Sequence, residues 1–215
     1  MKRHFVTASA IFAWICLAYS VSPAIDRGEF IISGGPCFTP IIGGEASSGD
    51  SSPDYNGIFK NGWGIGLDGM FVITNRLRAG FGFSVSVFRG DNLEGEDVGK
   101  WWVAPMLLGA QVFPLGSKHG SLRPYLRADI GMTFYGAVQV DNPGGETDLS
   151  LFRTSTAFAA DAGGGLEWIF SERWGVFAEV RYLITGHPIG GGDIPIHDPD
   201  SVSFLPIRLG LTYEY

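Results

Sequence analysis

Ten charged side chains lie on one face of segments that are otherwise apolar. Carboxylates beside arginines can serve acid–base chemistry, line a polar path, or pair with one another. Buried charge is costly unless it is paired, so we expect ion pairs here, with Arg127 across from Glu167 and Glu179 across from Arg208. We predict no catalytic residue among them. This lumen charge network comprises Asp68, Arg78, Arg127, Asp129, Asp161, Glu167, Glu179, Arg181, Arg208 and Glu214.

The histidines are the other residues whose type could support metal or catalytic chemistry. His187 and His197 lie in a glycine-rich segment, and Asp198 and Asp200 follow closely. Ligand identity without a scaffold that sets the geometry makes a poor site. We therefore predict no metal site and no cofactor.

Carboxylates also gather in the polar connecting segments. Oxygen ligands suit calcium and magnesium, yet no segment has the spacing of a known calcium loop. A solvated acidic rim is the simpler interpretation, and binding of cations or a basic partner is the alternative. The residues are Glu45, Asp50, Asp54, Asp91, Glu94, Glu96, Asp97, Asp141, Glu146, Asp148, Asp193, Asp198 and Asp200.

Alternation with a period of two predicts the elements that position these side chains. The clearest case is residues 159–184, which read as a hairpin around the turn at 171–173. One face of it carries apolar and aromatic residues, and the other carries charge and glycine. The predicted strands are 29–38, 59–73, 77–88, 100–113, 122–140, 154–170, 174–185 and 201–215, with long polar connections at 39–56, 89–99, 141–153 and 186–200.

The chemistry of the two faces predicts a membrane protein. A soluble sandwich or calyx would turn its aromatic face inward, whereas a membrane barrel turns it to lipid and keeps a polar lumen. We predict an all-β fold, an eight-stranded antiparallel up-and-down transmembrane β-barrel with long loops outside and short turns on the periplasmic side. The expected membrane-interface aromatics are Trp63, Trp101, Trp102, Trp168, Phe170, Trp174, Tyr213 and Tyr215.

The first residues carry the pattern of an export signal. A basic start precedes an apolar stretch and the small residues 22–24, so we expect a cleaved signal peptide at 1–24 and a barrel domain at 25–215. A cut after Ser20 is the alternative. Cys37 then has no partner in the mature chain, so we expect no disulfide. The net charge of −7 argues against a nucleic-acid partner.

The last strand carries the most specific pattern. Residues 208–215 (RLGLTYEY) place Gly210 before Tyr213 and Tyr215, the third-last and last positions, and this ending resembles the signal that barrel-assembly machinery recognises. Together with 123–126 (RPYL) and 165–168 (GLEW), the chain resembles the small eight-stranded OmpA/OmpX-type outer-membrane β-barrel family. The resemblance implies a Gram-negative outer-membrane location, with outer-membrane lipid and the assembly machinery as partners. We expect a monomer.

Three functions remain to be compared. A non-enzymatic surface barrel would act in envelope integrity, adhesion or partner contact through its acidic loops. A narrow porin-like or hydrophobic-solute transport barrel is the alternative. A soluble calyx disagrees with charge on the face opposite the aromatics. An eight-stranded barrel is just wide enough for side chains to fill, so we favour the surface barrel, with a lumen closed by charge pairs.

Overall fold

The computed structural model describes residues 29–44, 54–93, 96–115, 122–140, 149–189 and 201–215. The predicted signal peptide at 1–24 lies outside these ranges. So do most carboxylates of the predicted acidic rim, and also His197, Asp198 and Asp200. Within the described residues, no helix has the length and apolar character needed to cross a membrane.

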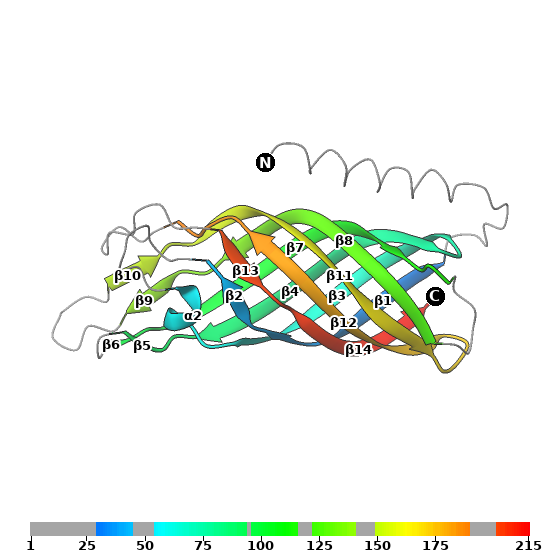
Figure 1. Ribbon diagram of the computed structural model, residues 1–215, viewed down its shortest axis with the longest axis horizontal. Helices are drawn as coiled ribbons and strands as arrows, with labels where there is room; N and C mark the ends of the chain where they lie inside the picture. The colour runs from blue at the N-terminus through cyan, green and yellow to red at the C-terminus, as the bar shows by residue number, and fades with distance from the viewer. Residues whose placement is uncertain (1–28, 45–53, 94–95, 116–121, 141–148, 190–200) are drawn as a thin grey trace.

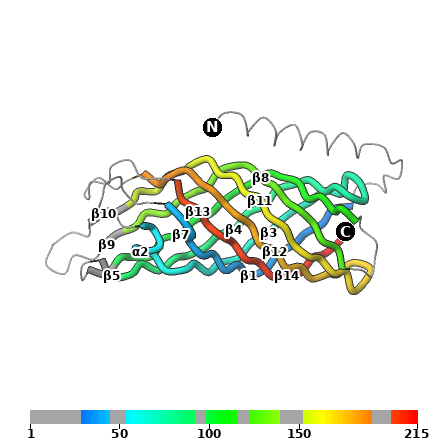
Figure 2. The backbone as a smooth tube through the Cα atoms, viewed as in Figure 1, coloured from blue at the N-terminus to red at the C-terminus, as the bar shows by residue number. Residues whose placement is uncertain are grey.

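Eight long strands form one closed antiparallel barrel (Figure 1). Each pairs with its neighbours along the chain, β1 pairs with β14, and the order of the predicted strands is confirmed. The strands run diagonally to the long axis (Figure 2), as closure of a sheet into a barrel requires. They are β1 (Phe30–Thr39), β3 (Gly62–Thr74), β4 (Leu77–Arg89), β7 (Lys100–Val112), β8 (Leu122–Tyr135), β11 (Ser155–Ile169), β12 (Trp174–Thr185) and β14 (Ile207–Glu214).

The two ends of the barrel differ. At the turn end, β3 and β4 and also β11 and β12 are joined directly, and the chain terminates beside them (Figure 1). The opposite loop end carries short elements, some within segments predicted to be loops. These are β2 (Ile41–Gly43), α2 (Tyr55–Ile58), β5 (Asn92–Leu93), β6 (Glu96–Asp97), β9 (Val138–Val140), β10 (Leu149–Phe152) and β13 (Val202–Phe204).

Two prolines interrupt adjacent strands at the same height. Pro40 separates β1 from β2, and Pro206 lies between β13 and β14. Proline has no N–H to donate to a ladder, so the two strands break together. The Leu205 N–H still donates to the Pro40 carbonyl at 3.0 Å, and the Arg181 N–H to the Pro206 carbonyl at 3.0 Å. The wall therefore stays hydrogen-bonded across the break.

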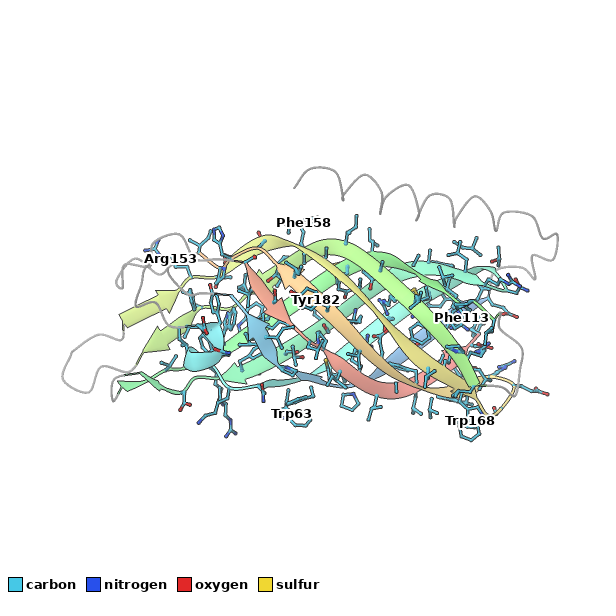
Figure 3. The ribbon with its side chains drawn as sticks, in the orientation of Figure 1. Trp63, Phe113, Arg153, Phe158, Trp168 and Tyr182 are labelled. Atoms are coloured by element: carbon cyan, nitrogen blue, oxygen red, sulfur yellow. The ribbon has the colours of Figure 1, made fainter. Side chains whose placement is uncertain are left out.

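The outward face of the barrel is apolar. Trp63, Phe158 and Trp168 point away from the wall in Figure 3, and each is at least half exposed. A continuous apolar surface of this size marks contact with a partner or with lipid. A solvent-facing outer surface would be polar, so the soluble calyx considered from the sequence is inconsistent with this fold.

Candidate functional site in the barrel interior

All ten residues of the predicted lumen charge network point into the barrel. Nine are buried, and the tenth, Glu214, has a side chain only 11% exposed at the turn end. They come from six strands, and the alternation of each strand directs the charge inward. The structure divides them into two groups at different heights.

The turn-end cluster consists of Arg78, Arg123, Glu167 and Glu214. Glu167 Oε2 lies 3.0 Å from Arg78 Nη1 and 2.9 Å from Arg123 Nη2. Glu214 Oε1 accepts from the same two arginines at 3.3 and 3.1 Å. The Phe113 ring lies 4.4 Å from the Arg78 guanidinium carbon, a cation–π distance. Two cations and two anions are thus paired beneath an aromatic ring.

The central cluster consists of three arginines and four carboxylates. Arg127 lies 2.9 Å from Asp68 and 2.5 Å from Asp129, measured between side-chain nitrogen and oxygen. Arg208 Nη1 lies 2.8 Å from Asp68 Oδ2. The cluster comprises Asp68, Arg127, Asp129, Asp161, Glu179, Arg181 and Arg208.

Glu179 contacts all three arginines of the central cluster. Its carboxylate lies 3.1 Å from Arg181 Nε, 3.4 Å from Arg208 Nη1 and 3.6 Å from Arg127 Nη1. The Tyr125 hydroxyl also donates to Glu179 Oε2 at 3.0 Å. Arg181 in turn pairs with Asp161 at 2.7 Å. A buried ion pair is tolerated only when further hydrogen bonds satisfy its polar atoms, and Glu179 receives several.

Inward-facing glycines make room for these large side chains. A Cβ on Gly82 would lie 2.5 Å from Asp68 Oδ1 and 2.8 Å from Arg127 Nη2. A Cβ on Gly66 would lie 2.8 to 3.0 Å from the Arg208 guanidinium. Glycine and charged residues therefore share the inner face because the large charged side chains need the space that a Cβ would occupy.

The predicted pairing of Glu179 with Arg208 is confirmed, since the two residues are direct cross-strand partners. The predicted pairing of Arg127 with Glu167 is wrong. Glu167 lies across from Arg123, and Arg127 lies across from Gly163, because β8 and β11 pair in a different register. Arg123 and Tyr125 were absent from the predicted network. Both share the alternation of Arg127, which is the signal that could have found them.

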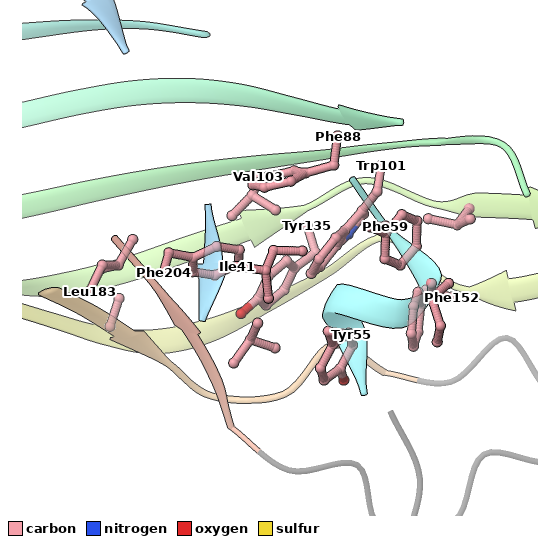
Figure 4. Close-up of a cluster of buried hydrophobic side chains, with 14 of the residues drawn as sticks. Ile41, Tyr55, Phe59, Phe88, Trp101, Val103, Tyr135, Phe152, Leu183 and Phe204 are labelled. Atoms are coloured by element: carbon pink, nitrogen blue, oxygen red, sulfur yellow. The ribbon is translucent and has the colours of Figure 1, made fainter. Parts of the chain in front are cut away.

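An aromatic cluster fills the interior toward the loop end (Figure 4). Trp101 lies at its centre, with ring centroids 4.9 Å from Phe59, 5.5 Å from Tyr135 and 5.6 Å from Phe88. The helix α2 contributes Tyr55 and Ile58, both buried. The buried members are Ile41, Tyr55, Ile58, Phe59, Phe88, Val98, Trp101, Val103, Leu107, Tyr135, Val138, Phe152, Ala159, Leu183, Val202 and Phe204.

Trp101 corrects one sequence prediction. It was expected at the membrane interface, but its side chain is fully buried inside the barrel, while its neighbour Trp102 is 39% exposed outside. The inner face of β7 is apolar here because it packs into the aromatic cluster. The other seven predicted interface aromatics point outward, and their role at a membrane interface stays a prediction. They are Trp63, Trp102, Trp168, Phe170, Trp174, Tyr213 and Tyr215.

Little free space remains between the two charged clusters. A cavity of about 10 Å³, close to the room needed for one water, is lined by polar side chains that include Gln111, Glu179 and Thr212. The Thr212 hydroxyl and Arg208 Nη2 are buried with no hydrogen-bond partner in the protein. Polar atoms of this kind are usually satisfied by ordered water, so the charged half of the interior has a reason to hold isolated waters.

Metal-ligating groups are not assembled in the described part of the chain, where no three of His, Cys, Asp and Glu lie together with suitable geometry. His187 is exposed beyond the end of β12. Gly210, part of the predicted assembly signal, faces inward, where a Cβ would lie 2.7 Å from the Phe177 ring and 2.2 Å from the Gly34 carbonyl. Recognition of this ending by assembly machinery stays a prediction.

Three solved structures of similar fold are distant from this chain in sequence. Outer membrane protein OprG from Pseudomonas aeruginosa aligns with a TM-score of 0.58 and 13% identity, over 88% of this chain and 96% of that one. The attachment invasion locus protein Ail of Yersinia pestis gives 0.56 and 16%, over 88% and 99%. Neisserial surface protein A gives 0.53 and 16%, over 88% and 100%.

No protein-family model matches the chain, and no curated protein sequence does. At such low identities the structural likeness concerns the fold. The closed ring of eight strands and the apolar outer face agree with that fold in the described residues. The chain has the fold of the small eight-stranded outer-membrane β-barrel proteins.

Proposed function

We propose that the protein is an integral outer-membrane barrel whose role is structural or surface-interacting and not enzymatic. The single observation that carries this proposal is the filled interior. Two ion-paired clusters occupy the turn-end half and an aromatic cluster occupies the loop-end half. An interior packed in this way leaves the outer surfaces and the loops as the parts available for function.

The outward face supports the membrane location. Exposed aliphatic and aromatic side chains occur along all eight long strands, which is typical of a lipid-facing barrel surface. The names of two similar structures describe a surface protein and an attachment protein. We extend that kind of role to this chain as envelope integrity, adhesion or partner contact.

Electrophoretic mobility tests the location. The mature chain refolded in lipid should migrate as a compact fast band without heating and slow down after boiling. A chain that stays soluble and folded in plain buffer without detergent would contradict the proposal. Impaired assembly of a Tyr215→Ala variant in cells, with normal refolding in detergent, would support the role of the C-terminal ending in biogenesis.

Planar bilayer recording tests the closed interior. The wild-type protein should give no stable single-channel steps, because ion-paired side chains and packed aromatic rings fill the described interior. Stable steps would favour a narrow porin-like barrel.

Transport of a hydrophobic solute is the second candidate, and the aromatic cluster is the observation that favours it. An apolar interior at the loop end offers contacts to an apolar solute that a charged interior would not. Vesicles containing the protein should then take up an apolar dye faster than empty vesicles. Equal uptake rates would leave the surface role as the better proposal.

A further inference from the structure

Exposed basic side chains form a cluster on the outer wall near the loop end. Lys60, Arg89 and Lys100 are all exposed, and they lie on three consecutive segments of the barrel wall. Arg89 and Lys100 are direct cross-strand partners, and the Lys60 N–H donates to the Arg89 carbonyl at 2.8 Å. We call these three residues the basic cluster.

The composition of the chain makes this cluster unusual. Of the eleven lysines and arginines in the described residues, five are in the interior and six are exposed. Three of the six exposed cations are neighbours in the basic cluster. Like charges directly opposite each other on two strands are destabilising, and an anion shared between Arg89 and Lys100 would relieve that repulsion.

Few described carboxylates neutralise the basic cluster. Asp91 pairs with Lys60 at 3.1 Å, and both side chains are about half exposed or more. No carboxylate among the described side chains pairs with Arg89 or Lys100. Arg89 and Lys100 are therefore available to an external anion. Lys60 is held by an exposed ion pair, and such surface pairs are weak.

The height of the basic cluster on the barrel identifies the occupant. Trp63, Val87 and Trp102 form a cross-strand row on the outer face, and Arg89 and Lys100 lie two residues further toward the loop end. Tryptophans sit at the level of lipid headgroups. Side chains just beyond them reach the phosphates of a lipid, and arginine and lysine are the residues that bind phosphate best.

We propose that the basic cluster binds the phosphate groups of membrane lipid in the leaflet that surrounds the loop end. This proposal rests on the proposed membrane location. The lipid would lie with its chains along the apolar wall beside Trp63 and Trp102, and with its phosphates against Arg89, Lys100 and Lys60. The barrel would thereby order the lipid at its own perimeter.

Lipid binding by purified variants tests the proposal. The refolded full chain in nonionic detergent is titrated with bis-phosphorylated lipid A and with the same glycolipid after dephosphorylation, and bound lipid is counted by native mass spectrometry. Wild type should bind the phosphorylated form more tightly. A triple variant, Lys60→Gln with Arg89→Gln and Lys100→Gln, should lose roughly fivefold in affinity per cation, on the order of a hundredfold in total at low ionic strength.

A second triple variant provides the matched control. Arg76→Gln with Arg153→Gln and Arg173→Gln removes the same charge from exposed positions elsewhere on the barrel, and it should retain wild-type binding. The proposal would be overturned if both triple variants lost the same affinity for the phosphorylated lipid, or if the first triple variant bound it as tightly as wild type. Equal binding of the phosphorylated and dephosphorylated lipids by wild type would also overturn it.

The heat-dependent mobility shift separates this test from the proposed membrane location. Wild type that never gives a compact fast band in lipid refutes the location itself. Wild type and variants that all give that band, but bind both glycolipids equally, refute only the phosphate site.

Discussion

Glu167 is the residue whose replacement tests the turn-end cluster most directly. It is 3% exposed and bridges Arg78 and Arg123 at 3.0 and 2.9 Å. Glu167→Gln keeps the shape but leaves two buried guanidinium groups to share Glu214. Breaking a buried ion pair by removing one partner costs about 3–5 kcal/mol. That loss is a large part of the ~5–15 kcal/mol by which folded proteins are stable.

The assay is equilibrium unfolding in lipid vesicles, with urea as denaturant and tryptophan fluorescence as the signal. Glu167→Gln should lower the free energy of unfolding by about 3–5 kcal/mol. Adding Arg78→Met leaves one cation, Arg123, with one anion, Glu214. The free energy of unfolding of the double variant should therefore exceed, by about 1–3 kcal/mol, the value expected from adding the two single losses. Glu172→Gln, in the exposed turn between β11 and β12, should change stability by less than ~0.5 kcal/mol.

One result would refute this reasoning. If Glu167→Gln and Glu172→Gln are equally stable, water must screen the turn-end cluster as it screens the surface. The ion pairs would then contribute little, and the interior at this end would be open to solvent. A Glu167→Gln loss with no recovery on adding Arg78→Met would instead place the cost in the hydrogen bonds that Glu167 accepts, and not in the unbalanced charge.

Three further changes test other parts of the interior. In single-tryptophan variants, brominated lipid should quench Trp102 strongly and Trp101 hardly at all, since only Trp102 is exposed on the outer face. Gly82→Ala should cost about 1–3 kcal/mol in urea unfolding because its Cβ meets the ion-paired Asp68 and Arg127, whereas Gly57→Ala, which meets nothing within 4 Å, should change stability by less than ~0.5 kcal/mol. Phe113→Ala should cost about 3–5 kcal/mol, since this ring is 1% exposed and covers Arg78; an unchanged urea midpoint would contradict its packing role.

The strands were predictable because each separates two different environments. Alternation along β11 and β12 assigns one face to apolar residues and every charge to the other, and the structure places all these charges inside. Alternation assigns a residue to the inside or the outside only where the two faces of a strand differ in polarity. At the start of β7 both faces are apolar, so the sequence did not show which of Trp101 and Trp102 points inward.

Pairing between strands was harder to predict than the strands themselves. Alternation limits a residue to one face, but the register sets its height, and Arg127 proved to lie across from Gly163 instead of Glu167. The aromatic cluster had no separate signal either. Tyr55 and Phe59 belong to a segment whose composition indicated a loop, and only their contacts with Trp101 inside the barrel explain α2.

The division of the interior into a charged half and an aromatic half limits how such a barrel could acquire a pore. Replacing the arginines and carboxylates with small polar residues would admit water from the turn end, but the water would stop at the rings around Trp101. The product would be a blind-ended well. Conduction would require a second, separate set of substitutions among the aromatics, so no single change in either half connects the two sides of the membrane.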